Sequence, residues 1–297
     1  MTDTPLAPLE SGVTPIFMHI EHTGGSTLNQ IIARQYAAHE RYEVYHLGQG
    51  VVAKFMALPE AERRRFRLIY GHLFYGIHRH VPGKSRYLTV MRHPVDRIIA
   101  SYTFLLRKTN NRRHDVYKTS GVSWADHLAE RRDEIRQISR IVGGDDELLQ
   151  KRRMQALPEN ALETAIAHLE NDFAMVGLQD RYDESLLMMR HVLNWQKPVA
   201  YVRKNVTSRR ITLADLPPDD RALIEKAAEI EMPLYEYAVR RFEAQVAAYP
   251  GDLERDLARL RDDNARYSTG IQRVERLKAP FRALKQAFSR AIKPPKP

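Results

Sequence analysis

The chain contains no cysteine, so neither disulfide bonds nor thiolate zinc sites contribute to its fold. The same absence gives weak support to a reducing compartment. No apolar run reaches the length of about 18 residues that a membrane-spanning helix needs, so no such helix is predicted. Residues 1–15 also lack the basic-then-apolar order of a secretory signal peptide. These absences argue against a membrane-anchored secretory enzyme.

Two kinds of ligand-binding motif are missing as well. The glycine-rich turn near the N-terminus lacks the Gly-x4-Gly-Lys-Ser/Thr pattern of ATP- and GTP-binding loops. The 12 histidines form no His-x-x-x-His pair and no convincing cluster with carboxylates, so no metal site is expected. No internal repeat is present, and with 43% apolar residues the chain can bury one substantial core.

Negative charge is in short supply, because 47 basic residues face 37 acidic ones and leave a net charge of +10. A surplus of this size predicts an anionic partner. Nucleotides, sulfated or acidic glycans, nucleic acids and lipid surfaces all qualify. Charge alone does not choose among them.

A short apolar strand predicted over residues 16–20 leads into a turn of glycine and hydroxyl residues, and a helix follows over 26–36. Glycine lets the backbone approach a ligand closely, and a helix N-terminus offers unpaired N–H groups and a positive dipole end. The candidate anion-binding residues are Thr23, Gly24, Gly25, Ser26 and Thr27. A Gly-Gly turn before a helix is as often only a turn, so this motif alone does not decide the function.

A second turn of this kind follows the strand predicted over residues 87–91. Arg92 stands at the end of that strand, and Pro94 opens a helix predicted to run to about Arg107. The Arg92 guanidinium would hold a phosphate in a fork geometry that lysine does not reproduce. The alternative is that its stem merely covers apolar surface. Two such turns predict a ligand with two separated anionic groups.

His72 is the candidate for acid–base chemistry, because it follows the short strand predicted over residues 67–70. An isolated histidine is more often structural than catalytic. Its expected place beside both anion turns favours a general base that accepts a proton from a hydroxyl group. Further along, Arg203 and Lys204 form a basic segment after a short edge strand predicted at 201–202. That segment either closes over a phosphate or is a solvated surface.

The order of these elements predicts an α/β fold with a mainly parallel sheet, because strands and helices alternate along the chain. A fourth strand is expected over residues 173–178, ahead of a helix over 183–193. Both anion turns then lie at the carboxyl ends of strands, where open α/β sheets bind ligands. The predicted units are a flexible N-terminus at 1–14, an α/β domain at 15–249 with a mostly helical insert at 108–158, and a helical basic extension at 250–297.

The extension carries apolar residues at alternating spacings of four and three, with Asn264 on the same seam. This heptad-like pattern is typical of coiled coils whose register a polar residue sets. It fits a parallel dimer through residues 251–279, a helical hairpin arm, or a helix packed on its own domain, of which we slightly favour the last. Beyond Pro280 the apolar positions share a face among basic residues, a pattern that fits peripheral contact with an anionic membrane.

Together these segments resemble the PAPS-dependent carbohydrate sulfotransferase family of the heparan and uronyl 2-O-sulfotransferases and their bacterial relatives, over roughly residues 15–245. The first turn is similar to the family's His-Ile-Pro-Lys-Thr-Gly-Gly-Thr-Thr loop, which holds the 5′-phosphosulfate of the donor PAPS. The second turn is similar to its Arg-Asp-Pro-Val-Glu-Arg segment, whose arginine holds the 3′-phosphate. Further matches are residues 69–72, where the family carries its catalytic histidine, and 176–186, 203–207 and 234–238.

The resemblance implies a P-loop-like three-layer α/β fold and in-line transfer of the sulfuryl group from PAPS to a hydroxyl, with PAP as product. In this scheme His72 takes the acceptor proton, His22 assists the leaving group when charged, and no metal is required. The donor contacts would be Thr23, Gly24, Gly25, Ser26 and Thr27 for the phosphosulfate, and Arg92, Ser101, Arg203 and Lys204 for the 3′-phosphate. The candidate acceptor contacts in the insert, which would form an acceptor wall or lid, are Arg112, Arg113, His114 and Arg140. The expected acceptor is a glycan or glycolipid rather than a nucleic acid, and the expected enzyme is of the bacterial, cytoplasmic type.

Three departures from the family pattern bear on this interpretation. His22 stands where the family's loop has lysine, and Glu21 replaces its proline. Ala100 takes the position of a serine that helps to bind the 3′-phosphate, with Ser101 one residue further on. Glu231-Met232-Pro233 interrupts a Leu-Asp run, which we expect to affect packing only.

Two other functions stay open. A nucleotide kinase of the P-loop type would need the lysine that the glycine turn lacks. A non-catalytic protein that keeps the sulfotransferase fold and binds PAP or an anionic glycan is supported by the missing loop lysine.

Overall fold

The computed structural model describes residues 6–45, 50–107, 114–119, 121–130, 137–151, 157–202 and 211–271. Five parallel strands form one sheet in the order β2-β3-β1-β4-β5. The strands are β1 (Thr14–Met18), β2 (Arg41–Val44), β3 (Leu68–Gly71), β4 (Ser85–Met91) and β5 (Phe173–Leu178). The predicted α/β fold with a parallel sheet is therefore confirmed.

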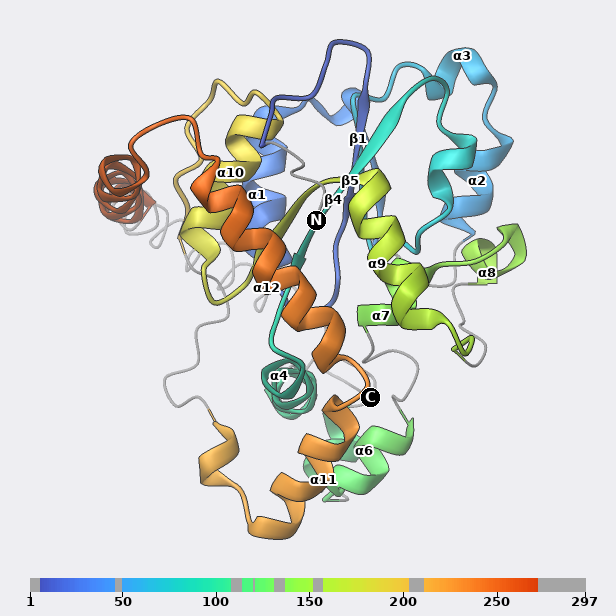
Figure 1. Cartoon of the computed structure of the whole chain (residues 1–297), viewed down its shortest axis with the longest axis vertical. Coiled ribbons are helices and arrows are strands. Elements are labelled where there is room, and N and C mark those ends of the chain that lie inside the picture. The colour runs from blue at the N-terminus through green and yellow to red at the C-terminus, as the bar shows by residue number, and fades with distance from the viewer. Residues whose placement is uncertain are drawn as a thin grey trace, which may run out of the picture.

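The central strands are apolar on both faces, which is why they form the inside of a parallel sheet rather than one wall of a sandwich. Ile16, Phe17 and Met18 of β1 are buried, and the residues of β3 are buried throughout. Helices cover both sides: Figure 1 shows α1 and α10 on one side of the strands, and α2 and α9 on the other. This gives the three layers that the resemblance implied.

The register of the sheet brings three strand ends together. Met18 at the end of β1 pairs with Gly71 at the end of β3 and with Thr89 near the end of β4. The Thr89 hydroxyl donates a hydrogen bond of 2.9 Å to the Met18 carbonyl, which ties β4 to β1 at that level. The turns that follow these strands therefore meet at one edge of the sheet.

The helices of the main body are α1 (Gly25–Gln35), α2 (Val51–Ala57), α3 (Glu60–Arg63), α9 (Ala161–Asp172), α10 (Tyr182–Val192) and α12 (Met232–Ala247). Of these, α12 packs on β5 and α9, and crosses in front of the strands in Figure 1. Short 3-10 helices lie at Ala38–Glu40, Ile77–His80 and Leu213–Asp215.

A second, smaller apolar cluster lies below the sheet, where α4 (Pro94–Arg107), α6 (Trp124–Glu130) and α11 (Pro218–Ala228) meet (Figure 1). Ile98 and Ile99 of α4 pack there against Trp124 and Ile224. The other described helices of the 108–158 segment are α5 (His114–Thr119), α7 (Gln137–Val142) and α8 (Asp146–Lys151). That this segment acts as a lid or acceptor wall stays a prediction.

Residues 253–271 form a helix, seen end-on in Figure 1 in dark orange to red. Leu260 is buried in the main core, and the side chain of Asn264 accepts a 2.7 Å hydrogen bond from the backbone N–H of Tyr201. The described part of the extension thus packs on its own chain. Residues 272–297 lie outside the described part of the structure, and dimerisation and membrane contact stay predictions.

Some of the predicted strands and helices are confirmed, and one is wrong. The helix predicted from Pro94 to Arg107 and the strand predicted over residues 173–178 are confirmed at the same bounds. The edge strand predicted at 201–202 was wrong, because the Tyr201 N–H bonds to Asn264 of the C-terminal helix instead of to a strand. Sequence analysis missed β2, of which only Val44 is buried.

Candidate active site

The loop between β1 and α1 is tight because two of its residues have no room for a side chain. A Cβ on Gly25 would stand 1.8 Å from Nε2 of His19, and one on Gly24 would stand 2.8 Å from the ring of Tyr182. Gly24 is also the N-cap of α1 and has a left-handed backbone with φ of 96°. Glycine is therefore required at both positions for the chain to enter α1 along this path.

The five predicted anion-binding residues offer different groups. The Thr23 hydroxyl is buried and donates a hydrogen bond of 2.8 Å to the Ile20 carbonyl, so it closes the turn from inside. Ser26 is exposed and Thr27 is buried, both in the first turn of α1. The Thr27 N–H donates to the Gly24 carbonyl at 3.1 Å, so the amides that this end of α1 presents, together with the positive end of the helix dipole, are those of Gly25 and Ser26. The loop can therefore hold an anion mainly through backbone amides.

Arg92 joins the two predicted anion turns. It follows β4 directly, and its Nη1 donates a hydrogen bond of 2.9 Å to the carbonyl of His22. His22 has a left-handed backbone with φ of 68°, and its ring meets that of Phe104 edge to face at 5.3 Å. The side chain of Gln137 continues the ladder at the end of β4, because it accepts from the Arg92 N–H at 3.0 Å and donates to the Arg92 carbonyl at 2.8 Å. The structure thus brings the two turns together as the sequence predicted.

His72 lies beside the loop, directly after β3. Its Nδ1 is 3.0 Å from the carbonyl of His19, and because a carbonyl only accepts, Nδ1 must carry the proton. The neutral ring then has its lone pair on Nε2. The ring stacks on that of His19 with centroids 4.6 Å apart, and meets the edge of Tyr45 at 4.9 Å. With 19% of its side chain exposed, His72 is held firmly yet reaches solvent, as a general base must.

Glu21 and Arg140 form an ion pair next to His72. Oε1 of Glu21 is also 3.5 Å from Nδ1 of His72. Burial alone would raise the pKa of Glu21, but the charges of Arg140 and His72 outweigh it and hold this pKa well below its usual range. The Arg140 guanidinium lies 4.3 Å from the ring centre of Phe74 and is buried. Arg140 was predicted as an acceptor contact, and the structure gives its guanidinium a partner within the chain.

His19 and Tyr45 support this cluster and stay neutral. Tyr45 donates its hydroxyl proton to the side-chain oxygen of Asn29 at 2.7 Å, so it accepts from Nδ1 of His19 at 3.0 Å. The pKa of His19 lies well below its ordinary value, mainly because the ring is buried and to a lesser extent because His72 lies next to it. Burial likewise raises the pKa of Tyr45 far above its ordinary value. Sequence analysis named neither residue as functional, although His19 opens the loop motif.

Of the remaining predicted site residues, Ser101 and His114 are buried, and the others lie outside the described part of the chain. Ser101 lies on the buried face of α4, and its hydroxyl has no hydrogen-bond partner among the described residues. His114 is buried and its Nδ1 donates to the Leu105 carbonyl at 3.0 Å, so its ring joins α5 to α4. The predicted residues Arg112, Arg113, Arg203 and Lys204 lie outside the described part of the chain.

A buried ion pair stands behind the site. Nη2 of Arg97 on α4 is 3.0 Å from Oε2 of Glu231, the N-cap residue of α12, and both side chains are at most 3% exposed. Oε1 of Glu231 also accepts a hydrogen bond of 3.2 Å from the Ile138 N–H on α7. Glu231 therefore links three helices, a more specific role than the general packing effect that we expected.

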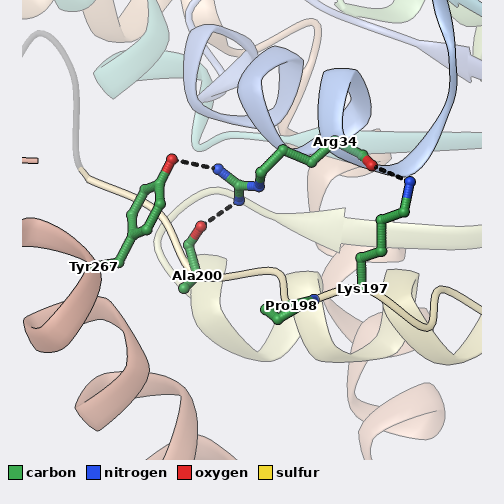
Figure 2. A pocket seen from close by; sticks show the side chains of 5 residues that line it. All are labelled: Arg34, Lys197, Pro198, Ala200 and Tyr267. Carbon is green, nitrogen blue, oxygen red and sulfur yellow. Dashed lines mark hydrogen bonds between the residues drawn. The ribbon is translucent and has the colours of Figure 1, made fainter. Parts of the chain in front are cut away.

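A separate hollow of about 450 Å³ lies at the other end of α1, between that helix, the segment 197–200 and the C-terminal helix (Figure 2). Arg34 is roughly 13 Å along the α1 axis from Gly25. Arg34 donates to the Tyr267 hydroxyl at 2.7 Å and to the Ala200 carbonyl, and Lys197 donates to the Arg34 carbonyl at 2.7 Å (Figure 2). This hollow is not part of the histidine site.

Within the described ranges, no three His, Asp or Glu side chains are placed to bind a metal ion. In the same ranges, no helix combines the length and the apolar character needed to cross a membrane.

Comparison with known proteins gives one matching family model and two relatives. The family model described as Galactose-3-O-sulfotransferase matches residues 138–291, just over half of the chain. Galactose-3-O-sulfotransferase 2 of Homo sapiens is 24% identical over 294 aligned residues, which cover 88% of this chain and 70% of the human protein. Galactose-3-O-sulfotransferase 2 of Mus musculus is 29% identical over 100 residues, which cover 33% of this chain and only a quarter (25%) of the mouse protein.

Proposed function

This chain belongs to the galactose-3-O-sulfotransferase family, and we propose that it transfers the sulfuryl group of PAPS to a carbohydrate hydroxyl with His72 as the general base. The predicted resemblance to a carbohydrate sulfotransferase family is thereby confirmed, and the matching family model is that of the galactose-3-O-sulfotransferases. The observation that carries the proposal is the meeting of the glycine loop, His72 and Arg92 at one edge of the sheet.

The residues at this edge fit a donor with two anionic groups. Backbone amides of Gly25 and Ser26 would hold the phosphosulfate, with the exposed hydroxyl of Ser26 beside them. Arg92 would hold the 3′-phosphate through its planar guanidinium. The buried hydroxyl of Ser101 has no hydrogen-bond partner among the described residues, so it would be available to hydrogen-bond a ligand oxygen.

His72 would supply the acid–base chemistry. Its Nε2 takes the proton of the acceptor hydroxyl as the acceptor oxygen forms its bond to sulfur and the bond from sulfur to the bridging phosphate oxygen breaks. The products are a sulfate ester, PAP, and a proton held on His72. His22 would stabilise the leaving phosphate when its ring is protonated. Sulfuryl transfer resembles phosphoryl transfer in that positioning and charge stabilisation provide most of the catalysis.

The acceptor is proposed as a class. The name of the family and of both relatives makes a glycan that contains galactose the first acceptor to test. Contacts from Arg112 and Arg113, and a cytoplasmic location, stay predictions.

A second candidate is a non-catalytic protein that binds PAP, and the specific observation in its favour is His22. A neutral imidazole in the loop would leave the bridging oxygen without a cation, whereas backbone amides would still bind the donor. This candidate predicts donor binding without transfer to any acceptor.

The first experiment is calorimetric titration of the full chain with PAP and, as control, with AMP. AMP lacks the 3′-phosphate, so tight PAP binding with weak AMP binding supports the donor site. Transfer from radiolabelled PAPS to a galactose-terminated oligosaccharide then separates the enzyme from the binding protein. His72→Ala should lower the rate about 10²-fold or more and leave PAP affinity within about twofold. Equal binding of PAP and AMP, or full activity of His72→Ala, would refute the proposal.

A further inference from the structure

Glu21 is a partly buried acid at the edge of a site proposed to bind a highly anionic donor. A carboxylate so placed repels phosphate and sulfate unless a cation offsets it. Arg140 provides that offset through its ion pair with Glu21. The ion pair therefore has a net charge close to zero and neither attracts nor repels the donor strongly. We look for its role elsewhere than in donor binding.

The contacts of Glu21 point to His72. Oε1 of Glu21 lies 3.5 Å from Nδ1 of His72, the nitrogen that also faces the His19 carbonyl at 3.0 Å. The Glu21 carboxylate oxygen and the His19 carbonyl oxygen can only accept hydrogen bonds. Both therefore favour the tautomer of His72 with the proton on Nδ1 and the lone pair on Nε2. Arg140 reaches to both partners, since Nη1 is 3.4 Å from the His72 carbonyl and Nη2 bonds to Glu21.

We propose that Glu21 is a positioning residue that fixes the tautomer of His72 and stabilises the imidazolium formed when the acceptor proton arrives. The inference rests on the proposed function, because it assumes that His72 is the base. The relation is that of a carboxylate behind a catalytic histidine, which holds the ring in one orientation and favours its charged form.

The surroundings of His72 agree with this assignment. Among the described residues, its ring contacts include His19 after β1, Tyr45 after β2 and Glu21 in the loop, and Arg140 on α7 lies at its backbone. Of these, His19 is kept neutral by burial, and so is Tyr45. Of these groups, Glu21 is the anion that faces the ring, and Arg140 is the cation that moderates it.

The test uses nuclear magnetic resonance of the full chain with isotope-labelled histidine, comparing the wild type with Glu21→Gln. Long-range nitrogen–proton correlations report the tautomer and the titration midpoint of each ring, and the signal lost in His72→Gln identifies His72. Glutamine keeps the shape of Glu21 but removes its charge. The matched control is Glu60→Gln, the same change in an exposed pair that Glu60 on α3 forms with Arg64, the C-cap of that helix.

In the wild type we expect His72 to carry its proton on Nδ1. In Glu21→Gln the His72 midpoint should move to lower pH by about one unit, and the population with the proton on Nε2 should rise. Glu60→Gln should change neither. A wild-type His72 with its proton on Nε2 would overturn the proposal whether or not the variant folds, and so would equal midpoints in the two glutamine variants.

A kinetic arm separates this inference from the proposed function. If the chain transfers sulfuryl groups, Glu21→Gln should lower kcat about tenfold, leave the KM for PAPS within about twofold, and move the acidic limb of the pH profile by the same amount as the NMR midpoint. Unchanged kcat would overturn the positioning role. Absence of transfer in every variant, including the wild type, would refute the proposed function while the tautomer and midpoint still decide the role of Glu21.

Discussion

Removing the charge of Glu231 should destabilise the fold strongly, because its partner is buried with it. Arg97 and Glu231 are at most 3% exposed, and the pair joins α4 to α12 at 3.0 Å. Glu231→Gln preserves the volume and an oxygen that can still accept from the Ile138 N–H. It removes the carboxylate charge that faces the buried Arg97 guanidinium at 3.0 Å. This single change therefore isolates the electrostatic part of the interaction.

The expected loss in free energy of unfolding is about 3–5 kcal/mol, the usual cost of leaving one half of a buried ion pair behind. For a chain of this size, each kcal/mol corresponds to a fall in Tm of roughly 2–4 °C, so a fall of roughly 6 °C or more should follow. The double variant Arg97→Met with Glu231→Leu removes both charges and fills the space with apolar groups. It should recover most of the loss, less about 1–3 kcal/mol for the Ile138 N–H left without its acceptor.

Urea unfolding followed by circular dichroism measures these differences. Glu60→Gln, in an exposed pair with Arg64, is the control and should change the free energy of unfolding by less than about 1 kcal/mol. The reasoning is refuted if Glu231→Gln is as stable as that control. It is also refuted if the double variant is no more stable than the single one, since the cost would then lie in packing rather than in the loss of the Arg97–Glu231 charge pair.

Three further predictions concern the loop. His22→Lys should raise the transfer rate at pH 8, where an ordinary imidazole with a pKa of about 6.5 is neutral, and equal rates across pH 6–9 would exclude His22 from leaving-group chemistry. Gly25→Ala should abolish PAP binding, because the added Cβ would stand 1.8 Å from Nε2 of His19 and would displace that ring. The control Gly270→Ala, whose Cβ would meet nothing within 4 Å, should leave PAP binding unchanged, and PAP titration measures both variants. Because the pKa of Glu21 is lowered in the folded protein, its charge stabilises the fold above the pKa of an unfolded glutamate, about 4.3, and this stabilisation is lost as pH falls. In urea unfolding, the stability advantage of the wild type over Glu21→Gln should therefore shrink below about pH 4.

The parts of the fold that could be predicted are those with a strong local signal. The helix α4 begins at a proline after a buried strand, and β5 is a continuous apolar run, so both were located at their bounds. By contrast, β2 exposes most of its residues and carries no such signal. The residues at 201–202 look like a strand locally, but a side chain some sixty positions later takes up the Tyr201 N–H. Such a tertiary contact leaves no trace in local pattern.

The same division holds at the candidate site. The glycine loop, His72 and Arg92 follow strands directly, so the parallel sheet was enough to predict that they meet. Arg140 was predicted only as an acceptor contact, whereas its pairing with Glu21 and the bonding of Gln137 to Arg92 bring in α7, a helix distant in sequence from β4 and from the loop. No spacing rule relates these positions. Glu21 was recognised as a departure from the family pattern, but its role depends on partners that only the structure places beside it.

The two substitutions in the loop act on opposite sides of the proposed reaction. His22 replaces a permanent cation near the leaving group with one that exists only when the ring is protonated. Glu21 introduces an anion near the base, and this anion favours a protonated His72. Low pH therefore charges His22 but also occupies the lone pair that His72 needs. A reaction that depends on both must be fastest in a narrow range of pH, and a single lysine at position 22 should widen that range on its alkaline side without moving the acidic limit.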